Sequence, residues 1–144
     1  MLTRPLPSTE LHLSVVGMGC WGIGGEHWGE DGSDARSEAT VRAALDHGIN
    51  WFDTAPIYGW GHSETVLSRA LGAERNQVMI ASKVGVERVD GHARSHLSPE
   101  NLRADLEASL RRLNRDCIDL LQVHWPCELD TPLEASFEAL AQLQ

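Results

Sequence analysis

The chain has 144 residues and carries 12 Lys and Arg against 21 Asp and Glu, which gives a formal net charge of −9. This length predicts a single domain, residues 1–144, with room for a hydrophobic core. The acidic balance argues against nucleic acid or an anionic membrane surface as a partner. No apolar run approaches the ~18 residues of a membrane-spanning helix, and no signal peptide is recognisable at the N-terminus.

The cysteine content predicts a reduced, cytoplasmic protein without a zinc site. Cys20, Cys117 and Cys127 form an odd and sparse set with no CxxC spacing. His92 and His96 lie in a polar segment and resemble a metal pair only superficially, so no metal is expected.

Apolar β-rich runs alternate along the chain with amphipathic helical patterns. Residues 2–14 are compatible with a short β-hairpin. Strands are predicted at 15–20, 49–53, 78–83 and 118–124. Helices are predicted at 34–47, at 63–71, after a Ser98 cap with Pro99 at the first position, and after a Thr131 capping box. Segment 87–96 reads as a solvated loop.

Helical spacing predicts which side chains each helix buries. The expected buried residues are Val41, Ala44 and Leu45; Val66, Leu67, Ala70 and Leu71; Leu102, Leu106, Leu110 and Leu113; and Leu133, Phe137 and Leu140.

Four strand–helix units indicate an α/β fold that is half of a closed barrel. Strand starts near 15, 49, 78 and 118 match the ~31 residues per unit of a (β/α)₈ barrel of ~250 residues. The chain is therefore predicted to be the N-terminal (βα)₄ half of a TIM barrel. Because its first and fourth strands would be unpaired edges, we expect it to form a homodimer through these edges, to pair with a missing half, or to flatten.

Four polar residues stand at or just past the carboxyl ends of the predicted strands: Asp53, Tyr58, Lys83 and His124. Catalytic groups of βα barrels lie on this face. Strand alternation places Lys83 on the inner face with Met79 and Ala81, and His124 there with Ile118, Leu120 and Gln122.

These residue types suit proton transfer to a carbonyl oxygen. A phenol such as Tyr58 is a weak acid, and a nearby ammonium favours release of its proton. Asp53 would hold Lys83 charged, and His124 would hydrogen-bond the same substrate oxygen. Hydride must then come from a cofactor, because side chains cannot supply it. The alternatives are a structural Asp53–Lys83 ion pair and a core histidine at 124. Lys83 is also the single lysine beside 11 arginines, which reflects either a need for an amine or chance and codon usage.

The segments around these positions resemble the aldo-keto reductase family, in its bacterial branch related to general stress proteins. The matching segments are 17–21, 44–50, 52–59, 61–64, 81–85, 109–113 and 119–126. The resemblance implies a catalytic tetrad of Asp53, Tyr58, Lys83 and His124, a small-molecule aldehyde or ketone substrate and NADP(H) as cofactor.

The resemblance also implies the binding surfaces. Gly19, Cys20, Trp21 and Asp53 are expected on the cofactor side, although the family often has Thr at position 20. A substrate-pocket mouth is expected to be lined by Trp21, Trp28, Trp60 and Trp125. The glycines of loop 21–29 lack Gly-x-Gly-x-x-Gly spacing, which argues against a phosphate loop. Most of the cofactor grip of the family comes from the second half of the barrel, which this chain does not supply.

Two functions of different class remain open. The chain is either the tetrad-bearing part of a longer or two-chain carbonyl reductase, inactive alone, or a non-catalytic half-barrel module that self-associates.

Overall fold

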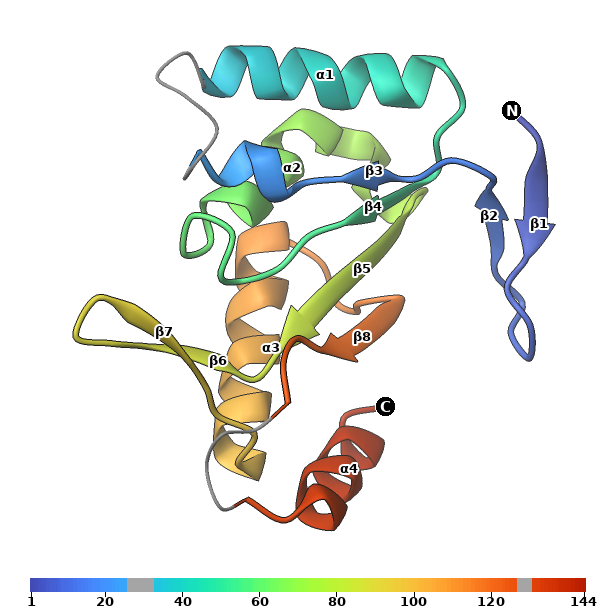
Figure 1. Ribbon diagram of the computed structural model, residues 1–144. Helices are drawn as coiled ribbons and strands as arrows, with labels where there is room; N and C mark the ends of the chain where they lie inside the picture. Colours follow the sequence, from blue (N-terminus) through green and yellow to red (C-terminus); the bar gives the residue numbers. More distant parts are fainter. Residues whose placement is uncertain (26–32, 127–130) are drawn as a thin grey trace.

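The computed structural model describes residues 1–25, 33–126 and 131–144, and its elements follow the predicted alternation (Figure 1). The strands are β1 Thr3–Pro5, β2 His12–Ser14, β3 Met18–Gly19, β4 Trp51–Asp53, β5 Met79–Val84, β6 Val86–Val89, β7 His92–Ser95 and β8 Leu120–Val123. The helices are η1 Trp21–Gly24, α1 Asp34–Asp46, α2 His62–Leu71, η2 Gly72–Asn76, α3 Pro99–Leu113 and α4 Leu133–Gln142.

The central sheet is parallel, with the order β3-β4-β5-β8. A helix follows each strand, because parallel neighbours need a crossover connection. The fold is therefore α/β and a partial (β/α)₈ barrel, as the strand spacing predicts.

The core lies between the sheet and its helices. One buried cluster joins Phe52 and Ile80 of the sheet to residues of α1 and α2, including Val41 and Leu67. A second cluster packs Val84, Leu97, Leu102 and Ala139, with Leu121 and Val123 against them. Met79, Ala81, Leu120 and Gln122 line the opposite, inner face of the sheet. This division confirms the predicted alternation for β5 and β8.

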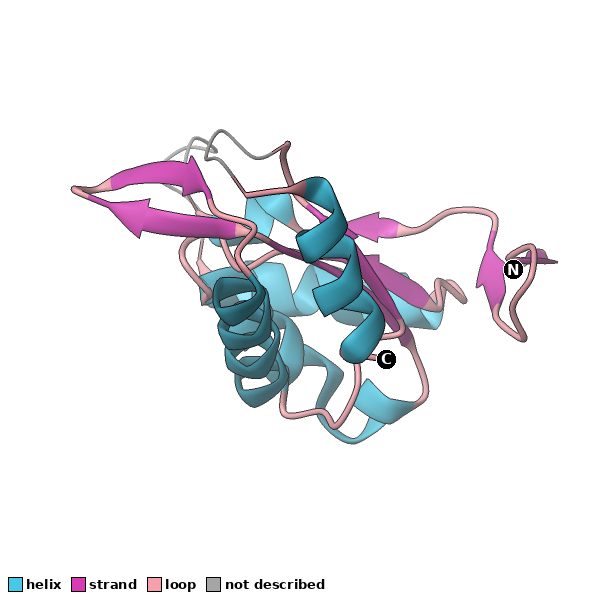
Figure 2. Ribbon diagram, turned by 90° about the horizontal axis from the view of Figure 1, so that it is seen from below, coloured by secondary structure: helices cyan, strands magenta, loops and turns pink. Residues whose placement is uncertain are grey.

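Two hairpins project from opposite ends of the sheet (Figures 1 and 2). The β1–β2 hairpin confirms the expectation for residues 2–14 and lies at the amino ends of the strands. The Asn50 side chain fixes it there by accepting a 2.8 Å hydrogen bond from the Ser14 amide and donating one to the His12 carbonyl.

The β6–β7 hairpin at the carboxyl ends corrects the expected solvated loop at 87–96. Val86 pairs with Ser95 and Val89 with His92. Asp90 (φ 49°) and Gly91 (φ 84°) make the turn, and positive φ at both central positions gives the twist that a two-residue hairpin favours. An expected loop is thus an ordered arm beside the predicted site.

Two further expectations about the sheet need correction. The first strand is only Met18–Gly19, because its register with β4 covers two residues and leaves Val15 and Val16 half exposed. Ile118 precedes β8 and packs against the helix-side cluster instead of the inner face.

Helix α4 also differs from its prediction. It begins after Pro132, so Thr131 forms no cap. Its buried residues are Ser136 and Ala139, whereas Leu133 and Phe137 are about 60% exposed. The small residues face α3 because they allow close approach, and the Ser136 hydroxyl donates to the Leu97 carbonyl at 3.0 Å. Of the predicted stripe, Leu133 and Phe137 therefore face outward, whereas Leu140 is half-buried and packs against the second core cluster.

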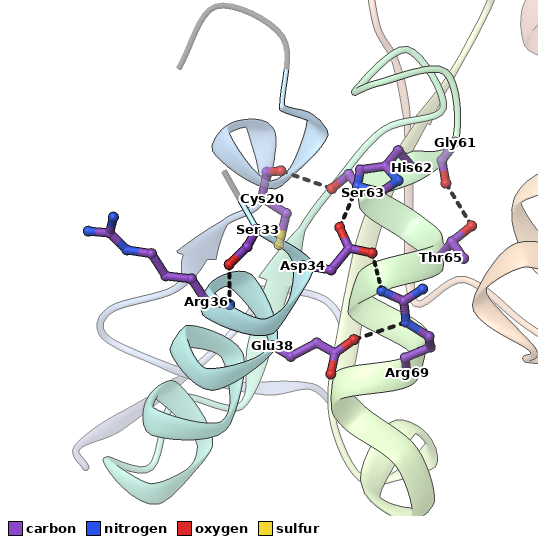
Figure 3. Close-up of polar contacts among 10 residues, drawn as sticks. All are labelled: Cys20, Ser33, Asp34, Arg36, Glu38, Gly61, His62, Ser63, Thr65 and Arg69. Carbon is purple, nitrogen blue, oxygen red and sulfur yellow. Dashed lines mark hydrogen bonds and ion pairs between the residues drawn. The ribbon is translucent and has the colours of Figure 1, made fainter. Parts of the chain in front are cut away.

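A polar network joins the start of α1 to α2 (Figure 3). Ser33 caps α1 by accepting from the Arg36 amide. The Asp34 carboxylate pairs with His62 and Arg69, and the hydrogen bond from Arg69 is the main cause that lowers its pKa. Both partners belong to α2, whose first turn follows the loop that carries Tyr58. The network thus joins α1 to the helix at which that loop ends.

Among the described residues, no helix has the length and apolar character needed to cross a membrane.

Candidate active site

The structure brings Asp53, Tyr58 and Lys83 into direct contact at the carboxyl edge of the sheet. Asp53 ends β4, Lys83 lies in β5, and Tyr58 lies between β4 and α2. The Lys83 Nζ lies 2.9 Å from both carboxylate oxygens of Asp53 and 3.2 Å from the Tyr58 hydroxyl oxygen. The sequence prediction that Asp53, Tyr58 and Lys83 lie together is therefore confirmed.

Lys83 is anchored so that it donates to Tyr58. Its third partner is the Thr54 carbonyl at 3.0 Å, so the three groups account for the three N–H donors of an ammonium. An ammonium cannot accept a hydrogen bond, so the Tyr58 oxygen accepts from Lys83. The hydroxyl hydrogen of Tyr58 is then left for an acceptor outside this pair.

The turn that presents Tyr58 has an unusual backbone. Gly59 (φ 60°), Trp60 (φ 53°) and Gly61 (φ 93°) are consecutive residues in the left-handed region. For the non-glycine residue this conformation costs about 1–2 kcal/mol. The Tyr58 carbonyl accepts from the Ser63 amide at 3.1 Å, which ties the turn to the start of α2. The backbone is thus held in a strained shape that places Tyr58 and Trp60.

His124 directly follows β8 and lies beside Tyr58. The two rings meet edge to face, with centroids 5.7 Å apart and an interplanar angle of 87°. Burial lowers the pKa of His124 below its usual value, and the positive charge of Lys83 lowers it further. The His124 Nδ1 is buried and has no hydrogen-bond partner in the described part of the chain. The four predicted residues therefore form one continuous series of contacts, in which Tyr58 touches both Lys83 and His124, with a neutral imidazole favoured at position 124.

A buried ion pair supports the site from the helix side of the sheet. The fully buried Glu64 pairs with Arg112 of α3, with 2.6 Å between Oε2 and Nε, and accepts from the Ser82 hydroxyl at 3.2 Å. Ser82 directly precedes Lys83, and Glu64 lies in the first turn of α2. This pair was not singled out from the sequence, although the 61–64 segment contains its glutamate.

A pocket of about 930 Å³ opens above Tyr58 and His124. It is lined by Trp21, Ile57, Tyr58, Trp60, Arg88, Gly91, His92, Ala93, His124 and Trp125. Three of the four tryptophans expected at the pocket mouth are thus on its wall, and Trp28 lies outside the described residues. Sequence reasoning missed the contribution of β6 and β7. The Asp90-Gly91 pair between alternating residues was the signal for that hairpin.

On the expected cofactor side, Gly19 borders free space, whereas Cys20 is buried. A side chain added at Gly19 would meet no atom within 4 Å, so free space adjoins this backbone. Gly19 and Asp53 also line the inner-face cavity of about 510 Å³.

Cys20, in contrast, is fully engaged within the protein. Its amide donates to the Asp53 carbonyl at 2.8 Å. Its carbonyl accepts from the Ser63 hydroxyl at 2.8 Å, as Figure 3 shows. Burial raises the pKa of its thiol to about 12, with the charge of Asp53 contributing. The thiol is therefore neutral and shielded from reagents. No group of three His, Cys, Asp or Glu side chains suited to a metal ion occurs within the described ranges.

Comparison with known proteins agrees with this arrangement. The Aldo/keto reductase family model matches residues 15–144. Aldo-keto reductase YhdN of Bacillus subtilis is 39% identical over 96% of this chain and 42% of its own length. NADH-specific methylglyoxal reductase of Escherichia coli is 36% identical over 97% of this chain and 47% of its own length.

Among solved structures, glycerol dehydrogenase AKR11B4 from Gluconobacter oxydans superposes with a TM-score of 0.86 at 40% identity, over 98% of this chain and 44% of that one. The holo form of aldo-keto reductase AKR11C1 from Bacillus halodurans superposes with a TM-score of 0.86 at 32% identity. The match covers 99% of this chain and 46% of that one. The chain thus spans less than half the length of these four relatives. It belongs to the aldo/keto reductase family.

Proposed function

We propose that this chain supplies the proton-transfer groups for nicotinamide-dependent reduction of aldehydes and ketones to alcohols. The observation that carries the proposal is the contact between Lys83 and Tyr58, with the ammonium anchored on Asp53. The names of the relatives, a methylglyoxal reductase and a glycerol dehydrogenase, support a small carbonyl or polyol as substrate.

Tyr58 is the proton donor in this proposal. The substrate oxygen lies between its hydroxyl and the His124 ring and accepts the Tyr58 proton as the alcohol forms. The adjacent ammonium of Lys83 stabilises the negative charge that develops on the phenol oxygen, so it lowers the barrier for the transfer. His124 orients the carbonyl by a hydrogen bond to the same oxygen.

The cofactor is proposed to bind against Gly19, Trp21 and Asp53, with the backbone at Cys20 as the wall behind it. The free space at Gly19 and the one-third exposure of the Asp53 side chain fit a ligand on this side. When bound, the reduced nicotinamide supplies the hydride. NADP(H) is the proposed form. An NADH-specific relative makes NADH the alternative.

The decisive test is Tyr58→Phe in the 144-residue chain and in the longest available form of the protein. Removing the hydroxyl should lower kcat for methylglyoxal about 10²–10⁴-fold, because general acid catalysis contributes on that scale. Cofactor affinity should stay within about twofold, since the hydroxyl faces the substrate oxygen in this proposal. Unchanged turnover in the variant would sink the role of Tyr58.

A titration with NADPH and with NADH separates cofactor binding from chemistry. Half-exposed Trp21 lies near the proposed cofactor side, so saturable quenching of tryptophan fluorescence is expected. If a folded sample shows no quenching with either cofactor, the chain holds the proton-transfer groups without a cofactor site. The ratio of the two affinities decides between NADPH and NADH.

A second candidate is self-association of two copies through the sheet edges. Leu120 on the β8 edge is 39% exposed, and Val15 and Val16 beside β3 are about half exposed. In the described residues neither β3 nor β8 has a second partner strand. Sedimentation should then show a dimer at micromolar concentration, and a stable monomer argues against this candidate.

A further inference from the structure

The pocket above Tyr58 and His124 has a charge opposite to that of the chain. The chain carries a net charge of −9. Yet the described lining of this pocket contains no carboxylate, and Arg88 is its permanently charged residue. Because acidic residues are in excess over the whole chain, a pocket lining with an arginine and no carboxylate is a specific feature of this site.

The β6–β7 hairpin sorts its charges onto two faces. Side chains alternate along a strand, so Glu87 and Arg88 point to opposite faces. Glu87 lies across from Arg94 and accepts from its Nε at 2.9 Å. Arg88 lies across from Ala93, which is too small to fill the space beside the guanidinium. The pocket-facing arginine therefore has no carboxylate partner among the described residues, whereas the arginine on the other face has one.

Arg88 is held over the pocket by Trp60. Its guanidinium carbon lies 5.0 Å from the centroid of the Trp60 ring, within the range of a cation–π contact. Trp60 is itself held in the strained turn after Tyr58. This contact is made to the face of a ring and not to a hydrogen-bond acceptor, so the N–H donors of the guanidinium are available to a ligand. These donors match the two oxygens of a carboxylate.

We propose that Arg88, held over the Trp60 ring by a cation–π contact, binds a carboxylate of the substrate, so that the preferred substrates are aldehydes or ketones that carry a carboxylate. The inference rests on the proposed function and names its substrate class. The carboxylate end lies against β6, and the carbonyl end reaches Tyr58 and His124 across the same pocket. Arg88 is then a specificity-determining residue.

The first experiment measures specificity with two matched substrates, para-carboxybenzaldehyde and para-methylbenzaldehyde. Their kcat/KM values are compared as a ratio, carboxylate over methyl, in the wild type, Arg88→Gln and Arg88→Lys. The ratio should fall about tenfold in Arg88→Gln, since charge-assisted bidentate hydrogen bonds are among the strong ones. The ratio for Arg88→Lys should lie between those of the wild type and Arg88→Gln, because lysine keeps the charge but lacks the planar guanidinium. Arg94→Gln removes the same charge from the opposite face of the hairpin and should keep the wild-type ratio.

The second experiment needs no turnover and so separates this inference from the proposed function. The 144-residue chain is titrated with para-methylbenzoate and with para-methylbenzamide, followed by tryptophan fluorescence. Tighter binding of the carboxylate in the wild type and in Arg94→Gln, lost in Arg88→Gln, supports the inference even if no carbonyl is reduced.

Equal binding of the two probes, or binding of neither, overturns it, even if neutral aldehydes are reduced. A loss of NADPH affinity in Arg88→Gln with an unchanged preference for the carboxylate also overturns it, because Arg88 would then serve the cofactor phosphates.

Discussion

Lys83 reaches back across the sheet edge to Asp53, with its Nζ 2.9 Å from both carboxylate oxygens. In the register of the two strands Asp53 faces Ala81, so Lys83 stands two residues further along β5. The lysine side chain folds over the end of β4, and this overhang brings its ammonium under the Tyr58 hydroxyl. The ion pair with Asp53 thus fixes the position of the ammonium that contacts the Tyr58 hydroxyl.

Replacing Lys83 by Met should lower kcat at least as strongly as Tyr58→Phe, about 10²–10⁴-fold, because the developing phenolate loses its cation. Stability should fall by about 1 kcal/mol, since Asp53 is only partly buried and its charge is screened by water. Urea denaturation and steady-state kinetics measure the two effects. Adding Asp53→Asn should recover stability but not turnover, and recovery of both would contradict the assigned role.

Arg112 and Arg111 provide a matched pair for the buried network. Arg112→Gln leaves the fully buried Glu64 carboxylate without its cation and should cost about 3–5 kcal/mol in the free energy of unfolding. Arg111 is 71% exposed and faces Glu107 at 3.9 Å, so Arg111→Gln should change stability by less than about 0.5 kcal/mol. Urea denaturation compares them. Similar losses in both variants would mean that the buried pair is not a stabilising contact.

Gly24 lies against the backbone of the Tyr58 turn. A Cβ at this position would lie 2.8 Å from the Tyr58 carbonyl carbon and the Gly59 amide nitrogen. Gly24→Ala should therefore destabilise the protein by about 1–3 kcal/mol, because backbone cannot move aside easily. Gly19→Ala, where the added methyl meets open space, is the control. Thermal unfolding that ranks the two variants the other way would contradict the contact.

His124 predicts a defined pH dependence of stability. Burial and Lys83 lower its pKa from the ordinary value of 6.5, so the unfolded chain takes up a proton first as the pH falls. The contribution of the neutral ring is complete above about pH 6.5 and is lost as the pH falls from there through the folded-state pKa. Urea unfolding between about pH 7.5 and 5 should show a smaller loss for His124→Gln than for the wild type. The same substitution at His12, exposed on β2, should leave the wild-type slope, and equal slopes for all three proteins would contradict the prediction.

The site and the fold differ in how far sequence predicts them. The meeting of Asp53, Lys83 and His124 was predictable because parallel strands end at one edge and strand ends can be recognised from apolar runs, whereas Tyr58 was predicted from its place in the loop after Asp53 and from the family resemblance. The buried face of helix α4 was not predictable, because the spacing of Leu133 and Phe137 identifies an apolar stripe without showing which element packs against it. Its contact with α3 depends instead on the size of Ser136 and Ala139. The hairpin that carries Arg88 has a local signal in Asp90-Gly91, but the contact of Arg88 with Trp60, far away in the sequence, leaves no local pattern.

The strand order β3-β4-β5-β8 has a consequence for how the chain folds during synthesis. Among the central strands each one pairs with the strand that precedes it in the chain. Strands β4, β5 and β8 therefore each find the edge of their described partner already made when they leave the ribosome. The sheet can grow in one direction, with Asp53, Lys83 and His124 added to its rim in that order. Assembly from the amino end then limits the time for which an apolar edge stays unpaired in the growing chain.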